Sequence, residues 1–170
     1  QRDYMAFISS IVRLKDMEIL EAQAVHLPRI VELKLAMFEE MGLGHLLASN
    51  FKPLVLSDYQ KLYESLEAKH FLATHGGTIV SMAGGFIKSD IPYRYFNNPR
   101  YGFVGDVYTL PSARRQDLAT TLNSHVLDWL KKEGVGMVRL LASDAARTIY
   151  KGFGFQETDE MVLTFPDEGP

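Results

Sequence analysis

Residues 101–155 read YGFVGDVYTLPSARRQDLATTLNSHVLDWLKKEGVGMVRLLASDAARTIYKGFGF, and this stretch decides the fold. It contains, in order, an apolar run, a proline, a basic turn, an amphipathic segment, a second apolar run and a short segment closing on Gly-Phe. The pattern predicts a strand over 101–110, a helix ending near Glu133, a strand over 137–142 and a short helix over 145–152. The two strands of such a crossover unit are expected to be parallel in one sheet.

The turn between the first strand and the long helix carries two adjacent arginines, Arg114 and Arg115. The first N–H groups of a helix have no intrahelical acceptor, and the helix dipole attracts negative charge to this end. Cationic side chains there oppose the dipole, so a bound anion explains their presence. We predict an anion site formed by these arginines and the backbone N–H groups from Gln116 to Thr120. The alternative is that both arginines are ordinary solvated side chains.

The segments outside this stretch predict a mixed sheet. Gly76-Gly77 supplies the positive φ of a two-residue hairpin turn, and Ser57 with Gln60 is typical of a helix N-terminal capping box. The expected elements are a strand over 18–25, helices over 27–41 and from Ser57, strands over 71–74 and 78–87, a loop over 91–100, and a last strand over 160–165. We therefore expect an α/β protein of α+β character, with a mixed, mostly antiparallel central sheet flanked by helices.

Composition favours one domain and excludes several functions. The chain has 170 residues with 46% hydrophobic content, so we expect a short N-terminal extension over 1–17, either a helix or a strand from Ser10 to Leu14, and a single domain over 18–170. The net charge of −3 disfavours broad nucleic-acid binding, and the chain has no cysteine. No apolar run reaches the about 18 residues of a membrane span, and the five histidines lack metal-ligand spacing, so we expect a cytoplasmic protein without a metal.

Two motifs in the opening stretch resemble the acyl-CoA-binding core of the GCN5-related N-acetyltransferase (GNAT) superfamily. The family's cofactor turn, Arg/Gln-x-x-Gly-x-Gly/Ala, stands here at 114–119 as RRQDLA, and its second signature, Tyr-x-x-x-Gly-Phe or Tyr-x-x-Gly-Phe, stands at 150–155 as YKGFGF. The order of elements from Glu18 to Phe165, with two helices between the first and second strands, also fits. The resemblance implies a GNAT-like fold and an N-acetyltransferase that moves an acetyl group directly from acetyl-CoA to an amine of a small molecule or peptide.

The resemblance also implies where the cofactor binds. The pyrophosphate is expected on the turn, and the strand is expected to offer backbone groups to the pantetheine arm, which lies in a splay between the two parallel strands. Ser143 and Ala146 are expected to flank the arm, although Ser143 can equally cap the following helix with Asp144. The implied cofactor residues are Val107, Tyr108, Thr109, Arg114, Arg115, Gln116, Asp117, Leu118, Ala119, Thr120, Ser143, Ala146 and Tyr150.

Tyr150 and Asp106 are the candidate catalytic residues. By resemblance, Tyr150 lies near the cofactor sulfur and either protonates the departing thiolate or positions it; the alternative is a tyrosine packed in the core. Asp106 is the candidate base, because a partly buried carboxylate with a raised pKa could accept the amine proton directly or through water. Alternation along the strand places Asp106 and Tyr108 on one face and Val107 on the other.

The acceptor side is less clearly marked in the sequence. Glu39 and Glu40, at the end of the first long helix, either attract a cationic substrate or form a solvated helix end. Tyr93 and Tyr95, in the loop over 91–100, either form a substrate wall or fold the loop onto the core. We expect a small-molecule amine as substrate, no nucleic-acid or membrane partner, and a homodimer, because many GNAT members dimerise.

Asp117 departs from the family pattern, which has glycine at this position. A carboxylate there adds like charge beside two phosphates and opposes the binding that the arginines favour. Either the side chain turns to solvent or caps the helix, with cofactor binding kept, or the pocket accepts a different acyl carrier, or cofactor binding is lost. The alternative function is therefore a catalytically impaired module of the same fold that binds a ligand or a protein.

Overall fold

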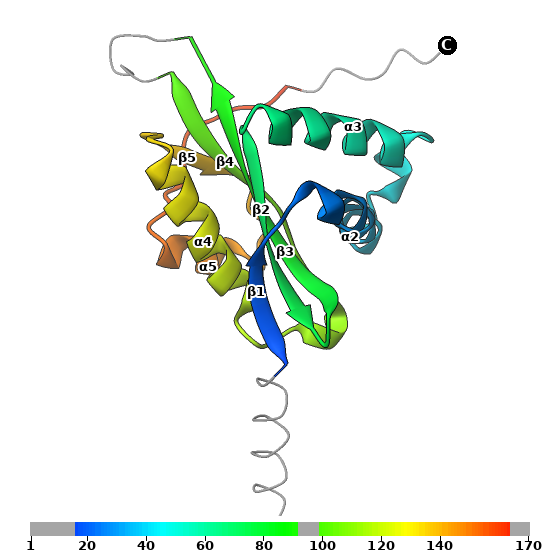
Figure 1. Ribbon diagram of the computed structural model, residues 1–170. Helices are drawn as coiled ribbons and strands as arrows, with labels where there is room; N and C mark the ends of the chain where they lie inside the picture. Colours follow the sequence, from blue (N-terminus) through cyan, green and yellow to red (C-terminus); the bar gives the residue numbers. More distant parts are fainter. Residues whose placement is uncertain (1–15, 92–98, 164–170) are drawn as a thin grey trace, which may run out of the picture.

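The computed structural model describes residues 16–91 and 99–163. Its centre is a five-stranded sheet in the order β1-β2-β3-β4-β5, in which the first four strands are antiparallel and β5 runs parallel to β4 (Figure 1). The strands are β1 (Met17–Glu21), β2 (Ala68–His75), β3 (Thr78–Ser89), β4 (Arg100–Thr109) and β5 (Val138–Leu140). The expected mixed, mostly antiparallel sheet flanked by helices is confirmed.

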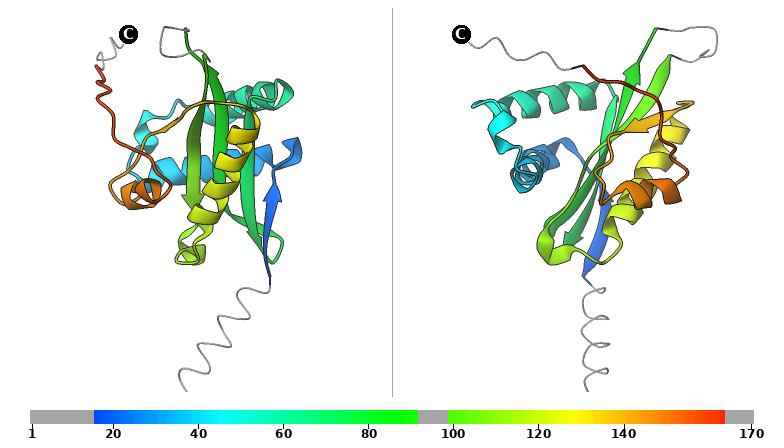
Figure 2. Two further views of the ribbon diagram at one scale, coloured as in Figure 1. Left: turned by 90° about the vertical axis from the view of Figure 1, so that its left-hand side faces the viewer. Right: turned by 180° about the vertical axis from the view of Figure 1, so that it is seen from behind.

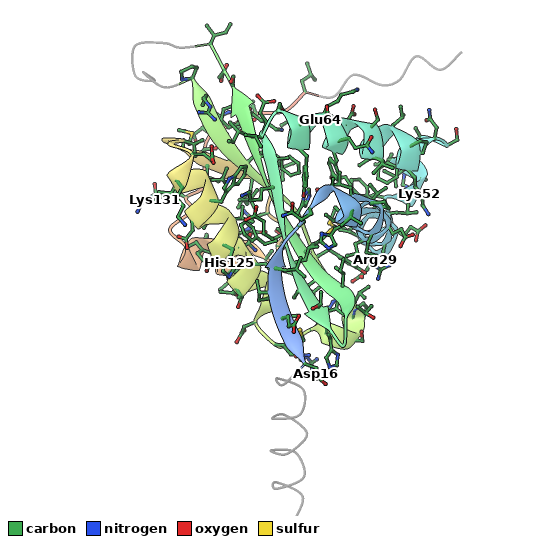
Figure 3. All side chains as sticks on the ribbon, viewed as in Figure 1. Asp16, Arg29, Lys52, Glu64, His125 and Lys131 are labelled. Carbon is green, nitrogen blue, oxygen red and sulfur yellow. The ribbon has the colours of Figure 1, made fainter. Side chains whose placement is uncertain are left out.

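Helices cover both faces of the sheet, as Figures 1 and 2 show. Helices α2 (Leu27–Glu40) and α3 (Phe51–Glu64) lie on one side, and α4 (Leu118–Lys132) and α5 (Arg147–Gly152) lie on the other. Side chains fill the space between each helical layer and the sheet (Figure 3). Leu122, Val126 and Leu130 of α4 are fully buried on one face, and Ile30 and Leu33 of α2 are buried on the other. The sheet therefore has an apolar cluster on each face.

A β-bulge in β4 changes which residues face α2 and α3. Met82 of β3 pairs with Tyr108, whereas Gly84 pairs with Gly105, so two steps along β3 match three along β4. The extra residue is accommodated at Asp106, whose φ is +54°. Val107 packs with the α4 cluster and Tyr108 with the α2 and α3 cluster, which confirms the predicted alternation there. The bulge directs Asp106 toward α2 and α3.

The parallel strands β4 and β5 touch over a short length only. Gly102, Phe103 and Val104 pair with Val138–Leu140, and beyond this point no strand among the described residues pairs with β4 on that side. The splay that the resemblance implied is therefore present, and it leaves residues 105–109 without a strand partner on the side of the opening.

The start of α3 was predicted wrongly. The helix begins at Phe51 rather than at Ser57, and its N-cap residue, Asn50, makes no side-chain capping bond. Pro53 is compatible with the first turn, and the ring of Phe51 packs 6.3 Å, centroid to centroid, from that of Phe38. Contact with α2 thus supports an extra N-terminal turn that the capping pattern did not indicate, since packing stabilises helices more than local propensity does.

The predicted last strand is absent from the described part of its range. Residues 160–163 are described without strand pairing, with Met161 94% and Val162 82% exposed, while 164–165 lie outside the described residues. A β-forming sequence becomes a strand only where a neighbouring edge takes its hydrogen bonds. The predicted structure of residues 1–15 also lies outside the described residues. No helix within 16–91 and 99–163 is long and apolar enough to cross a membrane.

Candidate active site

A cavity of about 1180 Å³ occupies the opening between β4 and β5 and continues toward α2 and α3. Gln116 and Glu39 do not line it, and Glu39 is exposed, in agreement with a solvated helix end. Tyr93 and Tyr95 lie outside the described residues. The predicted site residues that do line it are Glu40, Asp106, Val107, Tyr108, Thr109, Arg114, Arg115, Asp117, Leu118, Ala119, Thr120, Ser143, Ala146 and Tyr150.

The N-terminus of α4 forms one end of the cavity. Asp117 is the N-cap residue, and its backbone adopts the left-handed conformation, with φ +53° and ψ +21°. Glycine suits this conformation best, and aspartate tolerates it better than most residues do. The Asp117 side chain is exposed and makes no capping hydrogen bond, so the suggestion that it caps the helix is wrong. The N–H groups of Leu118, Ala119 and Thr120 occupy the first turn, where no intrahelical acceptor exists.

The two arginines of the turn differ in their partners. The guanidinium of Arg114 lies 2.6 and 2.7 Å from the two carboxylate oxygens of Glu40, and its Nε donates to the carbonyl of Thr109 at 3.0 Å. Tyr108 also donates to Glu40, at 2.9 Å. Arg115 lines the cavity, is exposed, and has no carboxylate within ion-pairing distance in the described part of the chain.

These contacts change the expected roles of Glu40 and Arg114. The side-chain hydrogen bonds from Arg114 and then Tyr108 lower the pKa of Glu40, so this carboxylate is ionised but already bonded within the protein. Arg114 in turn connects the turn before α4 with the end of α2 instead of pointing freely toward an anion. Arg115 is the arginine left to meet a negatively charged ligand.

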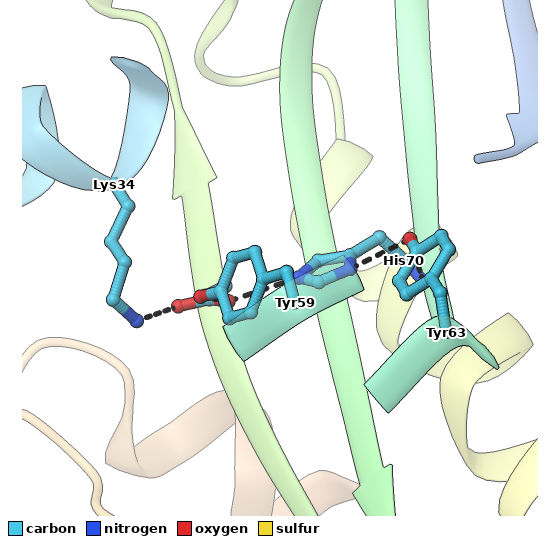
Figure 4. Close-up of polar contacts among 5 residues, drawn as sticks. Lys34, Tyr59, Tyr63 and His70 are labelled. Carbon is cyan, nitrogen blue, oxygen red and sulfur yellow. Dashed lines mark hydrogen bonds and ion pairs between the residues drawn. The ribbon is translucent and has the colours of Figure 1, made fainter. Parts of the chain in front are cut away.

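Asp106 is buried at the centre of a polar network with Lys34 of α2 and Tyr59 of α3. Figure 4 shows these two partners together with His70 and Tyr63. One carboxylate oxygen accepts from the ammonium of Lys34, and the other accepts from the hydroxyl of Tyr59. The second oxygen also lies 2.9 Å from Nε2 of His70, whose Nδ1 lies 2.9 Å from the hydroxyl of Tyr63. Because a carboxylate only accepts, this pattern places a proton on Nε2 of His70.

The expected upward shift in the pKa of Asp106 is wrong. Burial alone raises this pKa, but the hydrogen bond from His70 and the charge of Lys34 outweigh burial and hold it well below the usual range. Burial and the adjacent carboxylate raise the pKa of Tyr59, so its hydroxyl keeps its proton and remains a donor. The Asp106 side chain is 1% exposed and carries stable negative charge, which makes it a poor acceptor for the proton of a substrate amine.

Sequence reasoning missed the partners of Asp106, although two signals were present. Lys34 is four residues from both Ile30 and Phe38, so a charged residue stands in the apolar stripe of α2. Tyr59 and Tyr63 are also four residues apart and share one face of α3. His70 had no comparable signal, because its position in β2 depends on the space left by Gly84, where a Cβ would lie 2.8 Å from Nε2 of His70.

Tyr150, on α5, also lines the cavity. The residue is 8% exposed, and its ring packs edge-on against Phe155 at 5.8 Å. No described residue hydrogen-bonds its hydroxyl, and burial raises its pKa, so the hydroxyl is a protonated donor with no protein acceptor among the described residues. Ser143 lines the cavity nearby and does not cap α5, whose N-cap residue is Ala146 without a side-chain capping bond.

The opening fits coenzyme A. An extended arm can lie against residues 105–109, which have no strand partner on this side, and a pyrophosphate can accept hydrogen bonds from the N-terminus of α4 beside Arg115. The neighbouring Asp117 directs no hydrogen bond into the turn, so the N–H groups remain available. A splayed parallel strand pair beside a helix N-terminus is the arrangement that the resemblance to acyl-CoA-dependent transferases implied.

Comparisons with known proteins identify the family. A model of the "Acetyltransferase (GNAT) family" matches residues 36–155. The chain is 29% identical over 135 residues to an aminoglycoside N(6')-acetyltransferase type 1 of Acinetobacter genomosp. 13, covering 74% of this chain and 88% of that protein.

Solved structures share the fold. A protein from Clostridium acetobutylicum described as a predicted acetyltransferase, solved with acetyl-CoA, has a TM-score of 0.79 at 20% identity, over 88% of this chain and 96% of that one. The aminoglycoside N-acetyltransferase AAC(6')-Iy in complex with CoA has a TM-score of 0.69 at 18% identity, over 89% and 95% of the two chains.

The chain belongs to the acetyltransferase (GNAT) family, because the family model covers most of its length. The expected superfamily, the enzyme class of a GNAT-type acyltransferase, and acetyl-CoA as its cofactor are confirmed at the level of the family.

Proposed function

We propose that this protein transfers the acetyl group of acetyl-CoA directly to a primary amine of a small molecule. The observation that carries the proposal is a continuous cavity that joins the β4 and β5 opening to the space beside α2 and α3. Donor and acceptor can enter from its two ends and meet beside β4, and such positioning is a large part of catalysis. The aminoglycoside-modifying relative, which by its name acts on a small-molecule amine, supports this choice of acceptor.

The proposed cofactor contacts follow from the cavity. Backbone N–H groups from Asp117 to Thr120 and the guanidinium of Arg115 bind the pyrophosphate, and the backbone of Val107 to Thr109 aligns the pantetheine arm. Ser143 and Ala146 flank the arm from the other side of the opening. Arg114 acts through Glu40 by fixing the turn against α2.

The proposed chemistry needs two proton movements. Acetyl-CoA supplies a thioester carbonyl that an amine nitrogen attacks, so the amine loses a proton and the thiolate that leaves gains one. Tyr150 is the proposed proton donor, because it lines the cavity and its hydroxyl is protonated with no acceptor among the described residues. Asp106 holds the ammonium of Lys34 in place and so orders the neighbouring wall of the cavity. The proton of the amine is transferred to water in the cavity.

Release of free thiol from acetyl-CoA tests the function. The chain contains no cysteine, so a thiol-reactive dye reports coenzyme A against no protein background. Thiol release that requires both acetyl-CoA and an amine, with the acetylated amine found by mass spectrometry, is the expected result. Tight binding of acetyl-CoA without turnover of any primary amine would contradict the proposal. No observation on the described residues supports the non-catalytic alternative.

A further inference from the structure

The acceptor end of the cavity is lined mainly by apolar side chains. Phe38 of α2, Met41 at the C-cap of this helix, Phe86 of β3 and Phe103 of β4 all line this space. Such a lining fits the body of an acceptor with a hydrocarbon or aromatic part, because burying this part removes apolar surface from water. It offers few partners to an acceptor covered with hydroxyl and ammonium groups.

The carboxylates on the cavity wall are not available to a cationic acceptor. Asp106 is buried and accepts from Lys34, Tyr59 and His70. Glu40 is bonded by both Arg114 and Tyr108. Asp117, the remaining carboxylate among the described lining residues, lies at the start of α4, at the end proposed for the pyrophosphate. An acceptor with several positive charges would therefore find no free carboxylate among the described residues at its own end.

Lys88 gives this end of the cavity an available positive charge. It is exposed, and its ammonium lies 4.2 Å from the centroid of the Phe103 ring. No carboxylate among the described residues comes within ion-pairing distance of it. Lys34 lies deeper, 21% exposed, where its ammonium is shared with Asp106. An anionic group is the partner that the Lys88 ammonium lacks.

The strand register sets the separation between this charge and the site of transfer. In the β3–β4 register, Lys88 pairs with Tyr101, and Gly84 pairs with Gly105. The ammonium of Lys88 lies over the ring of Phe103, which is two residues from Gly105 along β4. Two residues of strand span about 7 Å. An acceptor amine beside the bulge at Asp106 and an anionic group on Lys88 would thus be separated by several bonds rather than share one carbon.

We propose that the acceptor is an elongated amine with a carboxylate at its far end and an apolar chain between the two groups. This proposal rests on the acetyltransferase function above and specifies its acceptor. The chain lies over Phe86 and Phe103, the amine reaches β4 at the bulge, and the carboxylate pairs with Lys88. Transfer forms the amide bond at the amine nitrogen and releases coenzyme A, and the carboxylate does not react.

Three acceptors of equal chain length test the proposal: 6-aminohexanoate, hexylamine and 1,6-diaminohexane, which differ only in the charge at the far end. We expect kcat/KM to be highest for 6-aminohexanoate, about fivefold above hexylamine, as suits one exposed ion pair, and lowest for the diamine. The substitution Lys88→Glu is expected to reverse this order. Lys52→Glu makes the same charge change at the exposed start of α3 (Figure 3), where Lys52 does not line the cavity, and should leave the order unchanged.

The outcomes separate this proposal from the function on which it rests. Equal or faster turnover of hexylamine or the diamine by the unaltered protein would overturn the acceptor class but leave the acetyltransferase function intact. If Lys88→Glu and Lys52→Glu changed the order of kcat/KM among the three acceptors equally, the proposed role of Lys88 would be overturned. Turnover of aminoglycosides with none of the three probes acetylated would also overturn the proposed acceptor class. Absence of turnover with every amine, despite acetyl-CoA binding, would instead contradict the function itself.

Discussion

Replacement of Asp106 by asparagine tests the buried network that forms the wall of the cavity. The carboxylate accepts from Lys34, Tyr59 and His70, and its side chain is 1% exposed. Asparagine keeps the shape but turns one acceptor into a donor and leaves Lys34 without its counter-charge. Breaking a buried ion pair from one side costs about 3–5 kcal/mol, a large part of the about 5–15 kcal/mol that stabilises a typical domain. At about 2–4 °C per kcal/mol, we expect Asp106→Asn to lower Tm by roughly 6–20 °C.

Thermal unfolding followed by circular dichroism measures this loss at pH 7. Because the folded-state pKa of Asp106 lies below its unfolded value of 3.8, the carboxylate stabilises the fold above that value and loses its contribution as the pH falls further. The unaltered protein should therefore lose stability more steeply than Asp106→Asn on acidification from pH 5. Asp128→Asn, on the exposed face of α4, is the matched control and should change stability by less than about 0.5 kcal/mol. A Tm for Asp106→Asn within 2 °C of the unaltered protein would refute the reasoning.

Five further substitutions, at four residues, test the cofactor end of the cavity. Arg115→Ala should weaken coenzyme A binding about tenfold in calorimetry, and Arg114→Ala less than threefold, because Arg114 is held by Glu40; equal effects would contradict this division. Asp117→Gly and Asp117→Asn should both tighten coenzyme A binding by removing like charge, with glycine also relieving the left-handed backbone and raising Tm; unchanged affinity would show that the carboxylate points away from the phosphates. Tyr150→Phe should lower kcat about a hundredfold with coenzyme A affinity unchanged; a kcat within threefold of the unaltered enzyme would exclude a proton-donor role.

The fold could be predicted from local patterns because its main signals are local. Gly76 and Gly77 have φ of +55° and +77° in the two-residue turn that joins β2 and β3, where such values were expected. The helices α2 and α4 follow stripes at helical spacing, and β4 and β5 are parallel across the crossover. Prediction failed where a long-range contact determines the start of an element. Helix α3 begins at Phe51, whose ring packs against that of Phe38 in α2.

The candidate site could be predicted only in part, for the same reason. The turn motif located the residues at the start of α4, but it could not show that Arg114 reaches Glu40, which is 74 positions away in sequence. The sequence also marked Asp106 as a charged residue in an apolar strand. Its pKa depends on donors from α2, α3 and β2, so the direction of the shift became clear only when these elements were placed together.

Calorimetric titration with acetyl-CoA is the most direct test of the central claim, that the opening between β4 and β5 is a working cofactor site despite Asp117. We expect saturable binding of one acetyl-CoA per chain, weakened by Arg115→Ala and by salt, as suits a contact with phosphate charge. Coenzyme A should compete for the same site. The absence of heat and of any thermal shift at millimolar acetyl-CoA would contradict the claim.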